Sequence, residues 1–127
     1  RPDRAQAGHR QDFHAESACA ITRQLLKRPD PPTAIFACND LMAIGVICAA
    51  AELGRRVPRD LAVIGFDNIQ LGNFSVPRLT TVAQPKDELV QTATRYMLER
   101  IADHSLPPRK SVIPTNLVIR QSCGHPV

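Results

Sequence analysis

Two short, uninterrupted apolar runs stand near the middle of the chain, at Ala34–Ala37 and Leu61–Gly65. Neither run alternates with polar residues, a pattern typical of parallel strands covered on both faces. The stretch between them predicts a helix from about Asp40 to Leu53, with Asn39 or Asp40 as its N-terminal cap. The order strand, helix, strand predicts a βαβ unit with a right-handed crossover.

Two further helices and two short strands complete the predicted elements. The helices run from about Ala15 to Leu26 and from about Lys86 to Ala102, and the strands cover Leu79–Val82 and Leu117–Ile119. The helix from about Lys86 to Ala102 carries an apolar stripe at four-residue steps. The stripe is made of Leu89, Ala93, Met97 and Ile101 and is flanked by Val90 and Leu98. These elements predict an α/β fold class with a mostly parallel sheet flanked by helices.

The helix predicted after Asn39 is apolar on every side, because its first charged residue beyond Asp40 is Glu52. A helix that lies on one face of a sheet needs only an apolar stripe. Either an alanine-rich surface is tolerated, since Ala is a strong helix former, or a second subunit covers the outer side. We expect a subunit interface here.

The composition is that of an ordinary globular domain. Of 127 residues, 43% are hydrophobic and 22% charged, which is enough to bury a core. No apolar run approaches the roughly 20 residues of a membrane span, so we expect no membrane partner. The N-terminus lacks the layout of a signal peptide. The net charge of +4 comes from scattered Lys and Arg, which favours solvated surface charges over a nucleic-acid patch.

The four cysteines do not predict a metal site. They are Cys19, Cys38, Cys48 and Cys123, with no C-x-x-C and no zinc-finger spacing, and the four histidines are dispersed. The first three lie in apolar stretches, where a thiol behaves as a small hydrophobe. A disulfide stays open, but buried reduced thiols favour the cytoplasm. We expect no metal and no other cofactor.

No arrangement of residues predicts catalysis. The six glycines are isolated, so neither a Walker motif nor a dinucleotide fingerprint is present. No serine stands in a G-x-S-x-G turn. Asp40 and Asp67 could form an acid–base pair, but nothing supplies a nucleophile. We therefore expect no catalytic residues and a protein that is not an enzyme.

Polar pairs follow the two predicted parallel strands: Asn39-Asp40 after the first and Asp67-Asn68 after the second. Ligands of open parallel sheets bind beyond the carboxyl ends of the strands, so both pairs could converge on one small polar molecule. The alternatives are structural: Asn39 caps its helix, and Asp67-Asn68 forms a turn. From the pattern alone, binding and structure are about equally favoured.

Three blocks resemble the LacI/GalR family of bacterial transcriptional repressors. They are Pro32–Gly45, with Ala37-Cys38-Asn39-Asp40 at its centre; Val57–Asn68; and Pro77–Pro85. The likeness extends from about Asp12 to Ser122, and Phe66-Asp67-Asn68 and Gln84–Asp87 look closest to the family's purine-repressor branch. The resemblance implies the C-terminal lobe, truncated, of a periplasmic-binding-protein-like (type I) effector domain.

Within that family, the effector lies in a cleft between two lobes. The resemblance implies that residues 1–81 form part of the C-terminal lobe, that residues 82–110 cross over and supply a helix to the N-terminal lobe, and that residues 111–127 return and end in a tail. Because that helix belongs to the other lobe, its stripe should be exposed here, and we expect the chain to cover it by dimerising, either in the family's manner or by swapping the helix.

By position, the resemblance implies that Asp67 binds effector hydroxyls, that Asn39 lies in the cleft, that Phe13 packs on a ligand ring and that His14 follows at a selectivity position. Ordinary core and loop roles remain the alternative for Phe13 and His14. His14 and Ser17-Ala18-Cys19 depart from the family pattern, which leaves the effector open. The resemblance also implies a dimer interface on the helix after Asn39 and on the loop after Asp67-Asn68. Its residues would be Met42, Ala43, Val46, Ile47, Ile69 and Leu71.

The function that follows is that of the effector-binding and dimerisation part of a cytoplasmic repressor. Its partners would be a small sugar or purine, a second copy of the chain, and operator DNA through a headpiece absent from this sequence. The alternative is a periplasmic solute-binding protein of the same fold. Effector identity, induction or co-repression, and the operator stay open.

Overall fold

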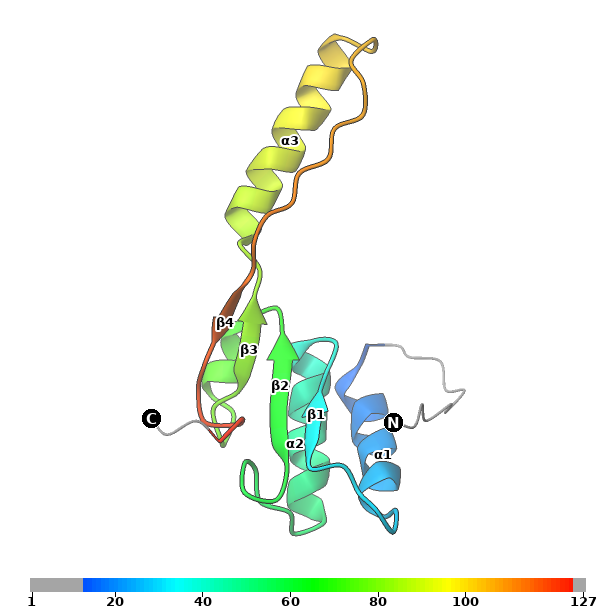
Figure 1. The fold of residues 1–127 in the computed structure, drawn as a ribbon, viewed down its shortest axis with the longest axis vertical. Helices are drawn as coiled ribbons and strands as arrows, with labels where there is room; N and C mark the ends of the chain where they lie inside the picture. The colour runs from blue at the N-terminus through cyan, green and yellow to red at the C-terminus, as the bar shows by residue number, and fades with distance from the viewer. Residues whose placement is uncertain (1–12, 125–127) are drawn as a thin grey trace.

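The computed structural model describes residues 13–124, which form a four-stranded sheet in the order β1-β2-β3-β4, three α-helices and one short 3-10 helix (Figure 1). The elements are, in chain order, α1 (Ala15–Leu26), β1 (Ala34–Phe36), α2 (Asp40–Glu52), β2 (Ala62–Phe66), η1 (Gln70–Asn73), β3 (Thr80–Ala83), α3 (Lys86–Ala102) and β4 (Asn116–Val118). The predicted elements are confirmed to within about a residue at each end, and η1 is the one that the sequence pattern did not predict.

The sheet is mostly parallel, as predicted. β1 pairs with β2 and β2 with β3 in parallel, with Ile35 opposite Val63 and Gly65 opposite Thr81. The last strand, β4, runs antiparallel to β3, with Leu117 opposite Val82. The chain therefore leaves the sheet along β3 and comes back beside it along β4.

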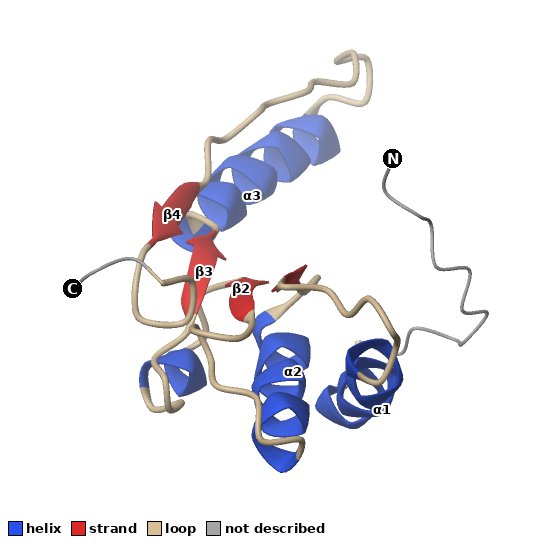
Figure 2. Cartoon of the chain, turned by 60° about the horizontal axis from the view of Figure 1, so that its bottom comes forward, coloured by secondary structure: helices blue, strands red, loops and turns tan. Residues whose placement is uncertain are grey.

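Both α1 and α2 lie on one face of the sheet, side by side (Figure 2). They pack closely at Gly45, where an added Cβ would stand 2.2 Å from the Ala15 carbonyl oxygen. α1 thus covers part of the surface of α2 that the sheet leaves free. The core cluster lies between these layers and comprises Ala18, Leu26, Ala37, Met42, Ala43, Val46, Ile47, Ala50, Leu61, Val63 and Leu79.

The opposite face of the sheet carries no helix within residues 13–124. Along β2, Val63 and Gly65 are buried, while Ala62, Ile64 and Phe66 are half-buried. Phe36 at the end of β1 is 62% exposed. The expectation that both faces are covered is therefore wrong for these residues, because an apolar run shows which strand can be buried and not what covers it.

Ser122 fixes the end of the chain to the sheet. Its hydroxyl donates to the Val63 carbonyl at 2.6 Å and accepts from the Thr80 amide at 2.8 Å. The residue is fully buried, and buried polar atoms need such partners. No buried side-chain polar atom among the described residues lacks a hydrogen bond.

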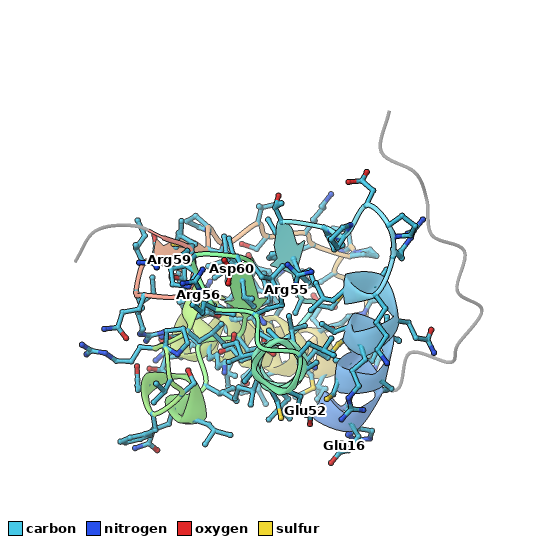
Figure 3. The ribbon with its side chains drawn as sticks, turned by 90° about the horizontal axis from the view of Figure 1, so that it is seen from below. Glu16, Glu52, Arg55, Arg56, Arg59 and Asp60 are labelled. Carbon is cyan, nitrogen blue, oxygen red and sulfur yellow. The ribbon has the colours of Figure 1, made fainter. Side chains whose placement is uncertain are left out.

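The turn before β2 lies at the amino edge of the parallel strands, seen from below in Figure 3. Arg56 donates to Asp60 from its backbone amide at 2.8 Å and from its guanidinium at 2.9 and 3.0 Å. The hydrogen bonds from the Arg56 guanidinium, and to a lesser extent the one from its backbone amide, lower the pKa of Asp60 to about 2. This turn is closed by its own ion pair.

α3 and the segment that returns from it extend away from the sheet and form an arm, residues 84–115 (Figure 1). None of the residues of α3 is buried. The return segment is attached to the helix by Arg109, which lies 4.1 Å from the centre of the Tyr96 ring and 2.5 Å from a Glu99 carboxylate oxygen. Among residues 13–124, only the return segment therefore covers the helix.

No helix in the described part of the chain is both long and apolar enough to cross a membrane.

Candidate functional site

An open cavity of about 500 Å³ lies where β2 and β3 end and α3 begins. Its lining is polar and comes from the two segments that connect the sheet to the arm: Asp67, Asn68, Gln84, Pro85, Lys86, Asp87 and Glu88. Because β2 and β3 are parallel, their carboxyl ends lie at the same edge of the sheet, where ligands of such sheets bind.

Asp67 and Gln84 form the centre of this cavity. The Gln84 side-chain amide donates to Asp67 Oδ1 at 2.6 Å, and the Asp67 backbone amide donates to the Val82 carbonyl at 2.9 Å. Asp67 is half-buried, and no described residue donates to its second carboxylate oxygen. A fixed carboxylate with one free oxygen is an acceptor for a ligand hydroxyl or N–H group.

The backbone at Asp67 and Asn68 has positive φ angles of 107° and 51°. Such angles are uncommon outside glycine, and they persist only where surrounding contacts hold them. Here the Asn68 amide donates to the Thr81 hydroxyl at 3.3 Å, and the Asn68 side chain accepts from Arg120 at 2.8 Å. Asn68 therefore serves the turn, whereas Asp67 is presented to the cavity.

Asp40 is a structural residue. It is fully buried, and its carboxylate accepts from the Ile69 amide at 2.8 Å and from the Thr81 hydroxyl at 2.5 Å. An added Cβ on Gly65 would lie 2.2 Å from Asp40 Oδ1, so there is no room for a ligand between them. The expectation that both polar pairs converge on one ligand is wrong for Asp40, which instead supports the turn that carries Asp67.

Asn39 caps α2, which is one of the two roles predicted for it. Its Oδ1 accepts from the Met42 amide at 2.8 Å, and its side-chain amide donates to the Phe13 carbonyl at 3.1 Å. This second bond brings the start of α1 to the carboxyl end of β1. Asn39 is half-buried and does not line the cavity at Asp67.

Phe13 and His14 precede α1 and are both exposed. Phe13 is 55% exposed and has a φ of 57°, which is strained for an aromatic residue. The structure thus brings the predicted site residues together in two groups, one of Phe13, His14 and Asn39 and one containing Asp67. The elements that carry these groups, the start of α1 and the carboxyl ends of β1 and β2, lie toward the edge of the sheet that faces the arm (Figure 1).

Gln84 was missed by the sequence analysis, as were the three charged residues that begin α3. The signal for Gln84 was available, because it follows β3 as Asp67 follows β2. The rule that selected the ends of the first two strands applies equally to the third. The contribution of Lys86, Asp87 and Glu88 depends on how α3 leaves the sheet, which no local pattern indicates.

The residues predicted for a dimer interface are mostly buried inside the chain. Met42, Ala43, Val46 and Ile47 are at most 9% exposed, whereas Leu71 is 52% exposed. The pairing of α2 with α1 and the sheet accounts for this burial without a second subunit. On α2, exposed side chains remain at Leu41, Cys48, Ala51 and Glu52.

Comparison with known proteins gives one matching family model, the periplasmic binding protein-like domain, over residues 2–123. The HTH-type transcriptional repressor PurR of Escherichia coli O139:H28 is 41% identical over 111 residues, which are 87% of this chain and 33% of that protein. The chain therefore spans about a third of the length of the curated relatives it matches.

Solved structures give the same fold. A putative transcriptional regulator LacI from Bacillus cereus subsp. cytotoxis has a TM-score of 0.85 at 31% identity, with 88% of this chain and 40% of that chain covered. A complex of the transcriptional regulator CelR with cellobiose has a TM-score of 0.81 at 36% identity, over 87% and 34%. A LacI family regulator from Enterococcus faecium with bound ribose has a TM-score of 0.77 at 34% identity, over 87% and 41%.

Proposed function

Because the chain belongs to the periplasmic-binding-protein-like domain family in its LacI/GalR form, we propose that it is the effector-binding and dimerisation part of a bacterial transcriptional repressor. The effector is a small sugar or purine. The observation that carries the proposal is the Asp67–Gln84 pair, which presents a half-buried carboxylate to a polar cavity at the carboxyl edge of the sheet.

The proposed division of the chain follows from the arm. Residues 1–81 supply part of the C-terminal lobe, residues 82–110 supply the crossover and a helix of the N-terminal lobe, and residues 111–127 supply the return strand and tail. The absence of any buried residue on α3 supports this division, since an apolar helix that belongs to another lobe has no core in this one. The cavity then lies at the border between the lobes.

In this proposal Asp67 accepts hydrogen bonds from vicinal hydroxyls of a sugar or from ring N–H groups of a purine. Gln84 holds the carboxylate in place through its bond to Oδ1. Phe13 packs on the ligand ring, with His14 beside it, and the exposed, strained conformation of Phe13 supports a role toward a ligand rather than in the core. Asn39 holds Phe13 at the cleft by its bond to the Phe13 carbonyl.

Effector binding between the lobes shifts the population between open and closed arrangements, which changes the affinity for operator DNA. That DNA is bound through a separate headpiece domain. The protein works as a homodimer in the cytoplasm and has no enzymatic activity. The transcriptional regulators among the relatives favour a repressor over a periplasmic solute-binding protein.

The dimer contact uses the surface that the chain leaves exposed rather than the buried side of α2. Leu71, on η1, is 52% exposed, Phe74, the residue after η1, is 72% exposed, and Leu41 on α2 is 42% exposed. Large apolar side chains that are exposed at the surface favour a protein partner.

The experiment is isothermal titration calorimetry of the protein against purine bases and against mono- and disaccharides. Asp67→Asn keeps the shape but removes the charge, and it should weaken binding of the accepted ligand by about 10-fold or more, because hydrogen bonds to charged groups contribute about 1.5–3 kcal/mol. Asp103→Asn, an exposed carboxylate at the far end of the arm, is the matched control. Equal affinity of wild type and Asp67→Asn would rule out the assigned role.

A further inference from the structure

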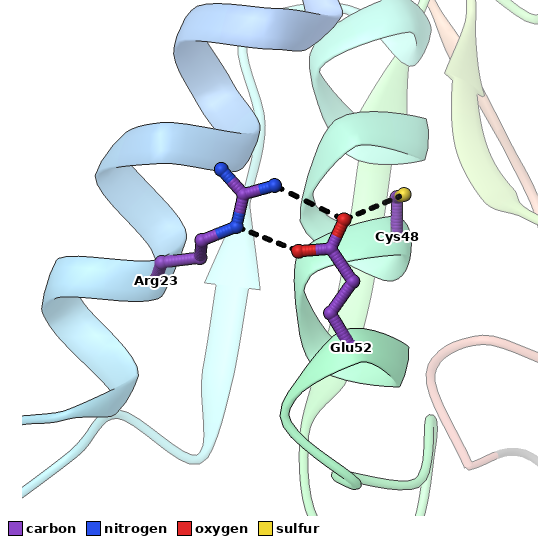
Figure 4. Close-up of polar contacts among 3 residues, drawn as sticks. All are labelled: Arg23, Cys48 and Glu52. Carbon is purple, nitrogen blue, oxygen red and sulfur yellow. Dashed lines mark hydrogen bonds and ion pairs between the residues drawn. The ribbon is translucent and has the colours of Figure 1, made fainter.

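A second group of polar side chains lies away from this cavity, between α1 and α2. The ligand atoms of Cys19, Cys48 and Glu52 all lie within 4.8 Å of one another. Cys19 comes from α1, and the other two come from one face of α2, where residues four apart are neighbours. Figure 4 shows Cys48 and Glu52 side by side, with Arg23 of α1 opposite them.

The spacing of these atoms is close to that of a tetrahedral metal site. Zn²⁺ binds thiolate sulfur at about 2.3 Å and carboxylate oxygen at about 2.0–2.2 Å, so its ligands stand roughly 3.6–3.8 Å apart. Cys48 Sγ lies 3.8 Å from Glu52 Oε1. The third ligand, Cys19, needs to move by no more than about 1 Å to complete this geometry.

Arg23 balances the charge of such a site. Its Nε donates to Glu52 Oε2 at 2.6 Å, and its Nη2 donates to Oε1 at 3.0 Å. A metal ion takes Oε1, the oxygen that faces Cys48, while Arg23 keeps the shorter bond to Oε2. Two thiolates, a carboxylate, a divalent ion and a guanidinium then sum to zero net charge, which removes the main cost of a charged group at a helix interface.

Access to the site is one-sided. Cys19 is 8% exposed and forms the inner wall, whereas Cys48 is exposed on the outer side of α2. Solvent reaches the group past Cys48, which gives an ion an entry path, and a water molecule would complete the four ligands.

We propose that Cys19, Cys48 and Glu52 form a binding site for one thiophilic divalent cation of the Zn²⁺ class, which joins α1 to α2. The two protons of the thiols are released to solvent on binding. Because α1 begins just after Phe13 and His14, the ion fixes the helix that carries this side of the proposed cleft. The site is separate from the Asp67 cavity and does not depend on the identity of the effector.

The test is titration of the reduced chain with Co²⁺ and then Zn²⁺, in the presence of a phosphine reductant that does not bind metal. Co²⁺ should give a thiolate-to-cobalt charge-transfer band at one ion per chain, and Zn²⁺ should displace it and raise the melting temperature. Cys48→Ser should weaken binding by more than about 100-fold, since even an outer-shell partner contributes about 10–100-fold. Its side chain is exposed, so this variant should fold.

Two further variants separate a metal site from other uses of the cysteines. Glu52→Gln should weaken Co²⁺ binding by about 10-fold or more, whereas it would leave a Cys19–Cys48 disulfide unaffected. Cys38→Ser, an exposed cysteine outside the group, should bind as the wild type does. Absence of the charge-transfer band would overturn the proposal, as would a band that persists in Cys48→Ser. Equal binding by Glu52→Gln would overturn the assigned ligand set.

Discussion

The sheet with its two helices and the arm contain similar apolar residues, yet they differ completely in what these residues contact. In the sheet body, residues 13–83, Leu61, Val63 and Leu79 are fully buried. On α3, Leu98 and Ile101 are 58% and 61% exposed, and no residue is buried. The body has its core within the chain, whereas the arm carries an apolar stripe without one. The spacing of apolar residues thus predicts a helix and shows which of its faces is apolar, but it does not show what that face packs against.

The largest expected effect is the contrast between one leucine in each region. Leu79→Ala should lower the free energy of unfolding by about 2–5 kcal/mol, since it removes a buried side chain and leaves a cavity. Leu98→Ala should change it by no more than about 0.5 kcal/mol. Urea denaturation of both variants measures the difference. Similar losses in the two variants would mean that the arm is packed in solution, which would break the contrast.

Gly45→Ala tests how closely the body is packed. The new methyl group would overlap the Ala15 carbonyl oxygen at 2.2 Å and push α1 from α2, at a cost of about 1–3 kcal/mol. Gly72→Ala is the matched control, because its Cβ would meet nothing closer than 3.5 Å. Thermal denaturation of the two variants should show a clear loss only for Gly45→Ala. An equal result for both would place the helices further apart than described.

Arg109→Ala tests what holds the arm together. It removes the contact with the Tyr96 ring and the ion pair with Glu99, each of which contributes about 0.5–1 kcal/mol at an exposed site. Hydrogen exchange should become faster in α3, whose helical amides are the protected ones in the arm, while the exchange of β2 amides stays unchanged. Lys110→Ala, the neighbouring cation, serves as control. Faster exchange in β2 as well would show that arm and body unfold together.

The smallest effect concerns Asp60, on the surface of the body. Arg56 lowers the folded pKa of Asp60 to about 2, below its ordinary value of about 3.9. The stabilisation is therefore complete above about pH 4 and is lost as the pH falls through 2. The urea midpoints of wild type and Asp60→Asn should differ at pH 6 and converge toward pH 2. A difference that does not change with pH would assign the effect to geometry instead of charge.

The sequence predicted the elements well because each rests on local signals. The helix 86–102 was predicted from its apolar stripe, and it is confirmed at both ends. The strand 61–65 was predicted from its apolar run and is confirmed with a shift of one residue. η1 was not predicted, since a single turn of 3-10 helix between two buried segments has no periodicity to read.

The candidate site was predicted only in part. Asp67 was selected from the end of its strand, and the structure places it in a cavity with Gln84. Asp40 was selected by the same rule and is a buried support instead. The two carboxylates differ in whether Gly65 and Thr81 enclose them, which depends on the packing of strands far apart in sequence. The approach of Cys19 to Cys48 likewise depends on how two helices cross, and so the spacing of cysteines could not predict it.

The chain crosses between sheet and arm twice, along β3 and back along β4, and the two strands are hydrogen-bonded, with Ala83 opposite Asn116. A single connecting strand can rotate about its own axis, but two paired strands resist rotation and permit mainly bending. We therefore expect the arm to move relative to the sheet mainly by bending. Because α3 extends about 25 Å at 1.5 Å per residue, a bend of a few degrees beside Gln84 displaces its far end by an ångström or more. A molecule that binds beside the Asp67–Gln84 pair would thus contact the point where a small bend moves the whole arm.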